Sequence, residues 1–322
     1  MIFGITMGDS SGVGPEIVLR AYGAGELKHD VVVFGDYEVL DYCNRRFGYG
    51  VPLNVVESPR QARDGALNVI DFGLMTEPDI TPGRINAKSG AAARAYVVAA
   101  AEAALRGDIA AMVTLPMNKE ATQLTDPKFV GHTELIGAVC GASDVTIMLA
   151  SDDLIVTHVT THCSLKEAIE RTKQPRIRKI IQLTSDAVLR LKPDARIAVA
   201  GLNPHAGEHG LFGREDIEEI APAVEWARAQ GMPVEGPLPP DTLFYLAVRK
   251  KKYDAIVCMY HDQGHIPLKL LDFEAGVNVA LGLPIIRTSV DHGTAFDIAY
   301  KGVAHTKSLV SALEFAARLA RG

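Results

Sequence analysis

Two glycine-rich nucleotide-binding motifs are missing from this sequence. None of its 29 glycines lies in a Gly-x-Gly-x-x-Gly pattern, which argues against a Rossmann dinucleotide site, and the absence of Gly-Lys-Ser/Thr excludes a P-loop. Cysteine is also scarce, and the four cysteines form no Cys-x-x-Cys pair. We therefore expect reduced, mostly buried thiols in a cytosolic protein. Cys163 adjoins His162, but no further base lies near it in the sequence, so nucleophilic catalysis by this thiol is disfavoured.

Long apolar runs and basic clusters are absent as well. No stretch approaches eighteen apolar residues without a charge, and residues 1–7 lack the basic start of a signal peptide. The net charge is −6 and no basic run exceeds residues 249–252, so the sequence gives little support to nucleic-acid binding. We expect a soluble, cytoplasmic protein with no membrane or nucleic-acid partner.

The sequence does contain a regular alternation of strand-like and helix-like segments. Apolar runs such as 110–115 and 255–259 are typical of buried parallel strands. Helix signals lie between them, including the serine start, alanine-rich middle and glycine stop of 89–107. Residues 145–149 and 154–159 indicate a hairpin. This alternation predicts an α/β fold, and 322 residues suffice for two domains.

Polar side chains follow three of the predicted strands. The run Tyr-His-Asp-Gln-Gly-His-Ile-Pro-Leu-Lys at 260–269 comes directly after one strand, and two other strands lead into Thr-Thr-His162 and Asn-Pro-His205. Ligands in α/β proteins collect at the carboxyl ends of strands. Neutral imidazoles are common transition-metal ligands, so His162, His205 and His261 are candidate metal ligands. Their spacing matches no compact metal motif, and a solvated loop with one satisfied histidine remains the alternative.

Further residues suit an anionic substrate. Gly131-His-Thr-Glu opens a predicted helix, where free backbone N–H groups can bind a phosphate; an N-cap with an exposed histidine is the alternative. Lys269 and Arg287 could bind a carboxylate or a phosphate, or they could be ordinary surface charges. Asp241 and Asp262 could orient imidazoles or accept protons.

Taken together, six motifs resemble those of the 4-hydroxythreonine-4-phosphate dehydrogenase family. In chain order they are Gly8–Glu16, Pro116-Met-Asn-Lys-Glu120, Gly131-His-Thr-Glu134, Gly201-Leu-Asn-Pro-His-Ala-Gly-Glu208, Met259-Tyr-His-Asp-Gln-Gly264 and Arg287-Thr-Ser-Val-Asp-His-Gly-Thr-Ala295. The resemblance covers essentially the whole chain, and the set is far more specific than any single motif.

The resemblance implies a fold like that of isocitrate and isopropylmalate dehydrogenases, with two α/β domains flanking a cleft, and an obligate homodimer. It implies a cofactor-side domain of residues 1–125 and 270–322, and a metal-binding and dimerisation domain of residues 126–269. The family completes its metal site across the dimer, so His162 and His205 would come from one subunit and His261 from the other. Because these histidines replace the aspartates of the isocitrate relatives, zinc is the expected metal, with magnesium or cobalt as substitutes.

By the same resemblance, five residues would contact the substrate: His132, Thr133, Lys269, Asn278 and Arg287. The first two would receive its phosphorylated end. Lys269 would also be catalytic, as the proton donor, and Asp241 would be a second catalytic residue near the metal.

The resemblance further implies that NAD binds on a loop, which agrees with the missing glycine-rich fingerprint. The residues of that loop are His292, Gly293, Thr294, Ala295 and Asp297. Their segment, taken by itself, predicts only a loop followed by a helix.

The implied activity is NAD- and metal-dependent oxidation and decarboxylation of a 4-phosphorylated hydroxy acid. A second histidine, His265, and the run 207–213 look more like the family's catabolic branch, which favours D-threonate 4-phosphate as substrate and dihydroxyacetone phosphate and CO2 as products. One alternative is 4-hydroxy-L-threonine 4-phosphate, of vitamin B6 biosynthesis. Another is terephthalate 1,2-cis-dihydrodiol, although the phosphate-linked motif at 131–134 argues against it. A non-catalytic sugar-phosphate-binding protein on the same scaffold is the alternative of a different class.

Overall fold

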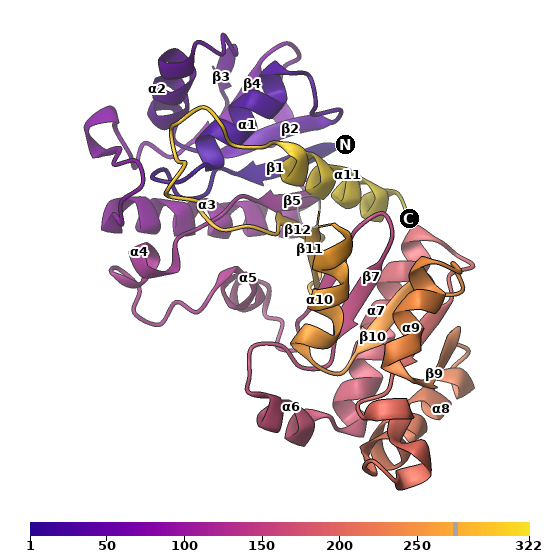
Figure 1. Ribbon diagram of the computed structural model, residues 1–322. Helices are drawn as coiled ribbons and strands as arrows, with labels where there is room; N and C mark the ends of the chain where they lie inside the picture. The colour runs from indigo at the N-terminus through magenta and orange to yellow at the C-terminus, as the bar shows by residue number, and fades with distance from the viewer. Residues whose placement is uncertain (273–275) are drawn as a thin grey trace. The chain divides into compact units, whose positions relative to one another are not determined.

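The computed structural model describes residues 1–272 and 276–322, which form two compact α/β units (Figure 1). Unit 1 comprises residues 1–145 and 283–321, and unit 2 comprises residues 146–282 together with Gly322. The predicted α/β class is confirmed. The divisions after residues 145 and 282 lie further along the chain than the expected boundaries after 125 and 269. They do so because helix α5 (His132–Cys140) packs on a helix of unit 1, and strand β11 (Val277–Leu281) pairs with a strand of unit 2.

The sheet of unit 1 is built from parallel pairs in the order β3-β4-β2-β1-β5-β12. Its strands are β1 (Ile2–Thr6), β2 (Asp30–Gly35), β3 (Leu53–Val55), β4 (Leu67–Asp71), β5 (Ala111–Thr114) and β12 (Arg287–Val290). The central strands are buried on both faces, which explains their nearly continuous apolar sequences. Their carboxyl ends meet at one edge of the sheet, and Arg287 begins the last strand in the order.

Six α-helices accompany this sheet: α1 (Gly14–Gly23), α2 (Tyr37–Phe47), α3 (Ala87–Leu105), α4 (Lys119–Gln123), α5 and α11 (Lys307–Arg321). Two short 3-10 turns, Pro59–Gln61 and Glu77–Asp79, lie in its connections. Helix α3 packs against β1, β2 and β5, and α11 packs against β5 and β12.

The start of α3 differs from the expected serine start at Ser89. Asn86 caps the helix, because its side-chain oxygen accepts hydrogen bonds from the backbone N–H groups of Lys88 and Ser89. The Ser89 hydroxyl instead donates to the buried carboxylate of Asp9. Asparagine and serine are comparable N-cap residues, so sequence preference alone could not decide between them.

The sheet of unit 2 has the strand order β11-β6-β7-β10-β8-β9. β6 (Thr146–Ala150) and β7 (Ile155–His158) pair antiparallel and confirm the predicted hairpin. β7, β10 (Ala255–Cys258), β8 (Ile197–Ala200) and β9 (Val234–Leu238) are parallel neighbours. The carboxyl ends of β7, β8 and β10 are the strand ends at which the candidate histidines were expected.

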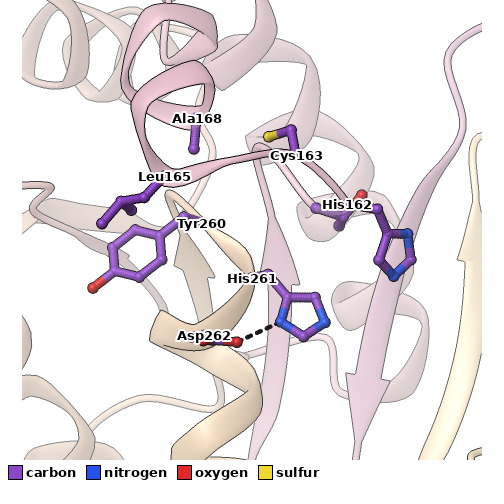
Figure 2. A pocket seen from close by; sticks show the side chains of 8 residues that line it. His162, Cys163, Leu165, Ala168, Tyr260, His261 and Asp262 are labelled. Carbon is purple, nitrogen blue, oxygen red and sulfur yellow. Dashed lines mark hydrogen bonds and ion pairs between the residues drawn. The ribbon is translucent and has the colours of Figure 1, made fainter.

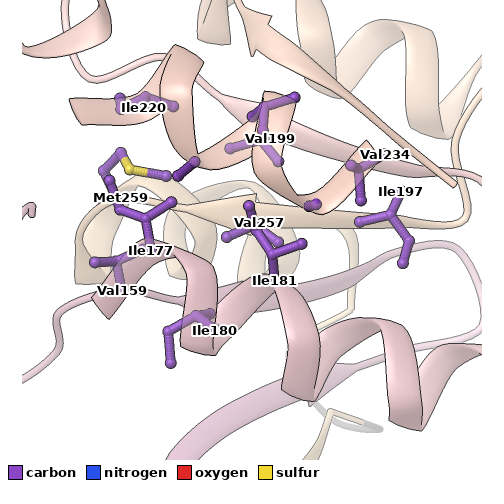
Figure 3. Packing of buried hydrophobic residues seen from close by; sticks show 13 residues of the cluster. Val159, Ile177, Ile180, Ile181, Ile197, Val199, Ile220, Val234, Val257 and Met259 are labelled. Carbon is purple, nitrogen blue, oxygen red and sulfur yellow. The ribbon is translucent and has the colours of Figure 1, made fainter. Parts of the chain in front are cut away.

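Alternating side chains of these strands fill two cores. Ile197 and Val199 pack with residues of α7 (Gln174–Leu191) and α8 (Ala221–Ala229), in the cluster drawn in Figure 3. Ala198 and Ala200 point the other way, into a cluster with residues of α9 (Pro240–Val248) and α10 (His261–Leu271). Val156 of β7 belongs to this second cluster, so the side chain two residues later, His158, also faces α10.

The remaining elements of unit 2 are α6 (Leu165–Arg171), a short 3-10 segment at Pro204–Gly210 and a single π-helical turn at Asp216–Ile220 that leads into α8. None of the helices in the described chain combines the length and the apolar character needed to cross a membrane.

Candidate active site

A pocket of about 500 Å³ lies in unit 2 beyond the carboxyl ends of β7 and β10 (Figure 2). The backbone N–H of Thr160 donates to the carbonyl of Met259 at 3.2 Å, so the segments that follow β7 and β10 leave the sheet side by side. One then forms the turn before α6, and the other starts α10. The pocket is lined by Thr161, His162, Cys163, Leu165, Ala168, Tyr260, His261 and Asp262.

The segment 260–269 is a helix and not a solvated loop. Tyr260 is the N-cap of α10 in an extended conformation, and His261 is its first residue. His261, His265 and Lys269 recur every four residues, which places them along one side of the helix. The alternative interpretation of this segment as a solvated loop is therefore wrong.

His162 and His261 face the same pocket, and their ring centroids are 5.6 Å apart (Figure 2). Nδ1 of His261 lies 2.6 Å from Oδ1 of Asp262, as expected for a carboxylate that orients an imidazole. That contact leaves Nε2 of His261 as the atom available to a metal. Two neighbouring imidazoles, one held by a carboxylate, are a donor set that fits a divalent transition metal.

His205 is not brought to this pair within the chain. Its ring lies 6.2 Å from that of Phe212 and its side chain is exposed. Within residues 1–272 and 276–322, no group of three or more His, Cys, Asp or Glu side chains is placed to hold a metal ion. This arrangement differs from the expected division of ligands, because one chain joins His162 with His261 and leaves His205 apart.

The backbone that carries His205 is unusual. His205, Ala206, Glu208 and His209 all have positive φ, between 41° and 57°, and Gly207 between them has φ of 81°. This left-handed turn costs roughly 1–2 kcal/mol for each non-glycine residue. Asp216 supports it, since its buried carboxylate accepts hydrogen bonds from the backbone N–H groups of Leu202 (2.8 Å) and Asn203 (3.2 Å). Backbone strain of this kind is concentrated at functional sites.

Two further histidines continue the row of rings behind the pocket. The rings of His261 and His265 are stacked, with centroids 3.5 Å apart and an interplanar angle of 11°. Nδ1 of His265 lies 3.1 Å from Nε2 of His158 and 3.0 Å from the carbonyl oxygen of His261. His158 is fully buried, and burial lowers its pKa to about 3, with the nearby His265 and His261 rings acting in the same direction.

The other residues expected in unit 2 occupy separate positions. Lys269 is half-buried near the end of α10, and Asp241 is exposed in the first turn of α9. Asn278 lies in β11, and its side-chain oxygen is buried without a hydrogen-bond partner in the described part of the chain. The structure does not bring Asp241 into the pocket with the two histidines.

Unit 1 holds a second polar site, formed by His132, Thr133 and Arg287. His132 and Thr133 open α5, after Gly131 as N-cap. Arg287, only 3% exposed, donates from Nη2 to the Thr114 hydroxyl at 2.7 Å. Among the residues described, neither Nε of Arg287 nor Nε2 of His132 has a hydrogen-bond partner. A buried, unsatisfied guanidinium N–H next to a helix start is suited to binding an anion.

The electrostatics of this site follow from burial and mutual repulsion. Burial, and next the positive charge of Arg287, lower the pKa of His132 to about 3. Burial lowers the pKa of Arg287 to about 10, while the Glu134 carboxylate acts in the opposite direction. Arg287 therefore remains charged at neutral pH and His132 remains neutral.

The expected cofactor loop lies against the glycine-rich turn that follows β1. The backbone N–H of Val13 donates to the Thr294 carbonyl at 3.1 Å, and the Tyr300 hydroxyl donates to the Ser10 carbonyl at 2.8 Å. A Cβ added at Gly12 would lie 2.9 Å from the Thr294 oxygen, so this close approach requires glycine. Of the loop residues, His292, Gly293 and Asp297 are exposed, whereas Thr294 and Ala295 are half-buried.

Sequence reasoning missed His158, Thr114 and the buried Asp9. His158 sits inside a run that is otherwise typical of a strand, and no feature of that run separates it from its neighbours. The pKa of Asp9 is raised by burial, against hydrogen bonds from Ser89 and from the backbone of Ser11 and Asn118. The Gly8–Glu16 motif was the one signal that could have directed attention to Asp9.

Known proteins resemble this chain over almost its whole length. D-threonate 4-phosphate dehydrogenase of Cupriavidus necator is 45% identical, covering 99% of this chain and 97% of the relative. 4-Hydroxythreonine-4-phosphate dehydrogenase of Beijerinckia indica is 44% identical, covering 98% and 94%. The crystal structure of 4-hydroxythreonine-4-phosphate dehydrogenase from Klebsiella pneumoniae is 42% identical, with a TM-score of 0.91 and 99% coverage of both chains.

Two other solved structures are similar to this chain at lower sequence identity. A terephthalate 1,2-cis-dihydrodiol dehydrogenase from Burkholderia xenovorans is 31% identical with a TM-score of 0.71, covering 98% and 97%. A β-decarboxylating dehydrogenase from Thermococcus kodakarensis is 12% identical with a TM-score of 0.50, covering 96% and 81%, and it shares the fold alone. The expected dehydrogenase-like fold is confirmed by this likeness. The family model described as pyridoxal phosphate biosynthetic protein PdxA matches residues 26–316, and the chain belongs to the PdxA family.

Proposed function

We propose that this chain catalyses the NAD- and metal-dependent oxidation and decarboxylation of a 4-phosphorylated hydroxy acid, with D-threonate 4-phosphate as the favoured substrate. The observation that carries this proposal is the anion site of unit 1. There the charged Arg287 keeps a buried N–H donor without a partner in the described chain, beside the unpartnered Nε2 of the neutral His132. A phosphate offers several charged acceptor oxygens to such donors. The names of two relatives, each a dehydrogenase of a 4-phosphorylated hydroxy acid, support the same class.

The reaction balances without a further reactant. A hydride leaves C3 of the substrate for NAD, and the C3 hydroxyl gives up its proton. The ketone formed at C3 is β to the carboxylate, so the C1–C2 bond breaks and CO2 leaves with the electron pair remaining on C2. Protonation of C2 then gives dihydroxyacetone phosphate.

Lys269 is the proposed donor of the proton to C2. It lies two turns after His261 on the same side of α10, and it is half-buried. An ammonium group at this position can deliver a proton to the carbanion-like carbon. A Lys269→Ala enzyme with near-normal turnover would exclude this role. Asn278, whose side-chain oxygen lacks a partner in the described chain, would bind a substrate hydroxyl, and Asp241 is retained as a candidate base.

His162 and His261 would hold the divalent metal, with zinc favoured for imidazole ligands and magnesium or cobalt as substitutes. When bound, the metal would act as a Lewis acid that lowers the pKa of a substrate hydroxyl. Asp262 keeps the His261 ring in the orientation in which Nε2 is available. The third ligand in this proposal is His205 of the partner subunit.

A homodimer would also cover apolar surface beside His205. Leu211, Phe212 and Ile217 are 73%, 47% and 42% exposed, which is unusual for large apolar side chains following one short turn. We assign dimerisation and metal binding to unit 2, and NAD binding to unit 1 through His292, Gly293, Thr294, Ala295 and Asp297. The four cysteines are free, which fits the reducing cytoplasm.

The decisive experiment measures NADH formation with purified protein and a panel of substrates. The panel contains D-threonate 4-phosphate, 4-hydroxy-L-threonine 4-phosphate, terephthalate 1,2-cis-dihydrodiol and unphosphorylated D-threonate. We expect the highest kcat/KM with D-threonate 4-phosphate, and formation of dihydroxyacetone phosphate in equal amount to NADH. Turnover of the dihydrodiol alone would contradict the proposal, and tight binding without any NADH would indicate a sugar-phosphate-binding protein.

The metal is tested separately. Treatment with a chelator should abolish NADH formation, and a single added divalent ion should restore it. His162→Ala and His261→Ala should each prevent this restoration. Full activity after exhaustive chelation would exclude a metal-dependent reaction.

A further inference from the structure

A continuous row of four imidazole rings runs from the pocket into the core of unit 2. The centroid distances along it are 5.6 Å from His162 to His261, 3.5 Å from His261 to His265, and 4.6 Å from His265 to His158. The first two rings line the pocket, whereas His158 is fully buried. A polar ring buried in an apolar core is costly unless its partners are satisfied, so the two inner histidines require an explanation.

The hydrogen-bond geometry indicates one tautomer for each of the two inner rings. The carbonyl oxygen of His261 can only accept, so Nδ1 of His265, 3.0 Å away, carries a proton and donates it. Nε2 of His158 lies 3.1 Å from the same N–H and therefore acts as an acceptor. His158 then carries its own proton on Nδ1, which has no hydrogen-bond partner in the described chain. One N–H is shared between a carbonyl and an imidazole nitrogen, and this fixes the plane of the His265 ring.

The packing at Gly264 shows that this arrangement is closely fitted. A Cβ added there would lie 2.5 Å from Nε2 of His158 and 3.0 Å from the Cys258 sulfur. Helix α10 therefore approaches β7 so closely that no methyl group fits between them at this point. The His158 ring is confined by the helix backbone on the side where it meets His265.

We infer that His158 and His265 are a positioning pair for His261: His158 fixes the His265 ring through the shared N–H, and the His265 ring fixes the plane of His261 by stacking on it. Neither ring lines the pocket, so the pair would act through His261 and not by direct contact with the substrate. Because His261 is a proposed metal ligand, the consequence for metal affinity depends on the proposed function. The tautomers and the ring geometry do not depend on it.

The first test is made on metal-free, substrate-free protein labelled with 15N-histidine. Nitrogen–proton correlation spectra distinguish the two neutral tautomers of each ring. We expect both His158 and His265 to carry the proton on Nδ1, with the signals assigned from the His158→Phe and His265→Phe variants. A proton on Nε2 of His158 would overturn the inference whatever the protein catalyses.

The second test titrates the metal-free protein with Co²⁺ alone and follows its visible absorption. Substitutions of groups that orient metal ligands weaken metal binding by about 10- to 100-fold. We expect His265→Phe, which keeps a ring but loses the N–H, to weaken Co²⁺ binding about 10-fold, and His265→Leu, which loses both, about 100-fold. His158→Phe should resemble His265→Phe. The double variant with both changes to Phe should be no weaker than His265→Phe alone, because His158 acts only through His265.

Two controls separate the possible failures. His305→Phe, at an exposed histidine of unit 1, should leave Co²⁺ affinity unchanged. His261→Ala should abolish the Co²⁺ signal; if it does not, the proposed metal site is wrong, while the tautomer result still decides the positioning pair. If His261→Ala abolishes binding but the two Phe changes have additive effects or none, the inference is overturned. Thermal unfolding confirms that each variant is folded.

Discussion

Each unit buries a histidine whose pKa is lowered to about 3, yet the two surroundings differ in a way that separates binding from support. His132 in unit 1 lies near a charged Arg287, and both keep donor or acceptor atoms without partners in the described chain. His158 in unit 2 meets another imidazole through Nε2, and its Nδ1 has no hydrogen-bond partner in the described chain. The difference lies in the neighbours: a buried guanidinium with an unsatisfied N–H is suited to bind an anion, whereas a ring in contact with other imidazoles is suited to hold them in place.

The comparison also shows how a similar pKa can have different consequences. Repulsion from Arg287 contributes to the low pKa of His132, so an anion that neutralises Arg287 would raise it. The pKa of His158 is lowered first by burial and then by its two histidine neighbours, so an anion in unit 1 should leave it unchanged. The pKa of His132 should therefore change when an anion binds in unit 1, whereas the pKa of His158 should stay the same.

Replacing Arg287 in the unit 1 site should have the largest effect of the changes considered. Arg287→Met removes a buried charge from the proposed phosphate site, and we expect kcat/KM for D-threonate 4-phosphate to fall by about 100- to 1,000-fold. Arg287→Lys keeps the charge without the planar fork and should recover part of the loss. Steady-state kinetics with phosphorylated and unphosphorylated threonate measure the effect. An equal loss for both substrates would argue against phosphate binding at this residue.

Acid should destabilise the protein through His158. Its pKa is about 3 when folded and about 6.5 when unfolded, so between these values the unfolded chain binds more protons and the free energy of unfolding falls as pH falls. From pH 6.5 to 4.5 this single group should cost roughly 2–3 kcal/mol, at about 1.4 kcal/mol per unit. Urea unfolding of wild type and His158→Leu across this range measures it. The variant should show the smaller slope, and identical slopes would contradict the buried neutral state.

A double-mutant cycle should reveal that the two inner histidines act as a pair. Each single change to Leu leaves a buried polar group with a lost partner, and we expect a cost of about 1–3 kcal/mol. The double change His158→Leu/His265→Leu replaces both by apolar groups and should cost about 1–2 kcal/mol less than the sum of the single changes. Denaturant unfolding provides the three values. Simple additivity would show that the contact contributes nothing to stability.

A change at the N-cap of α3 should have the smallest effect and serves as a reference. Asn86→Ala removes the cap of α3 and should cost about 1 kcal/mol of stability, while Asn86→Ser, which can still cap, should cost less. Neither change should alter Co²⁺ affinity or the KM for the phosphorylated substrate. A marked change in either value would show that α3 influences the sites more than its local contacts suggest.

The success of the sequence analysis follows from what local patterns can encode. Strand ends were visible because apolar runs stop abruptly, and this marked His162, His205 and His261 as histidines at strand ends. His205 could not be separated from them, because its distance depends on a left-handed turn that no local propensity predicts. The sequence did not single out His158, because the residues next to it form the same strand pattern that would surround a buried valine. Its role depends on a ring that lies 107 positions away in the sequence.

The two observed units divide further along the chain than the boundaries that the resemblance implies. Helix α5 lies after the expected boundary at residue 125, yet its packing on α3 places it in unit 1. Long-range packing of this kind is not recorded in the composition of a single segment.

The backbone from His205 to His209 is left-handed, a conformation that L-amino acids disfavour. Within this stretch only Gly207, which has no side chain, adopts it without a steric cost. The carboxylate of Asp216 accepts hydrogen bonds from the backbone N–H groups of Leu202 and Asn203, and so holds the segment from which this stretch starts. Removing the acceptor at position 216 should therefore alter the direction of an imidazole eleven residues earlier.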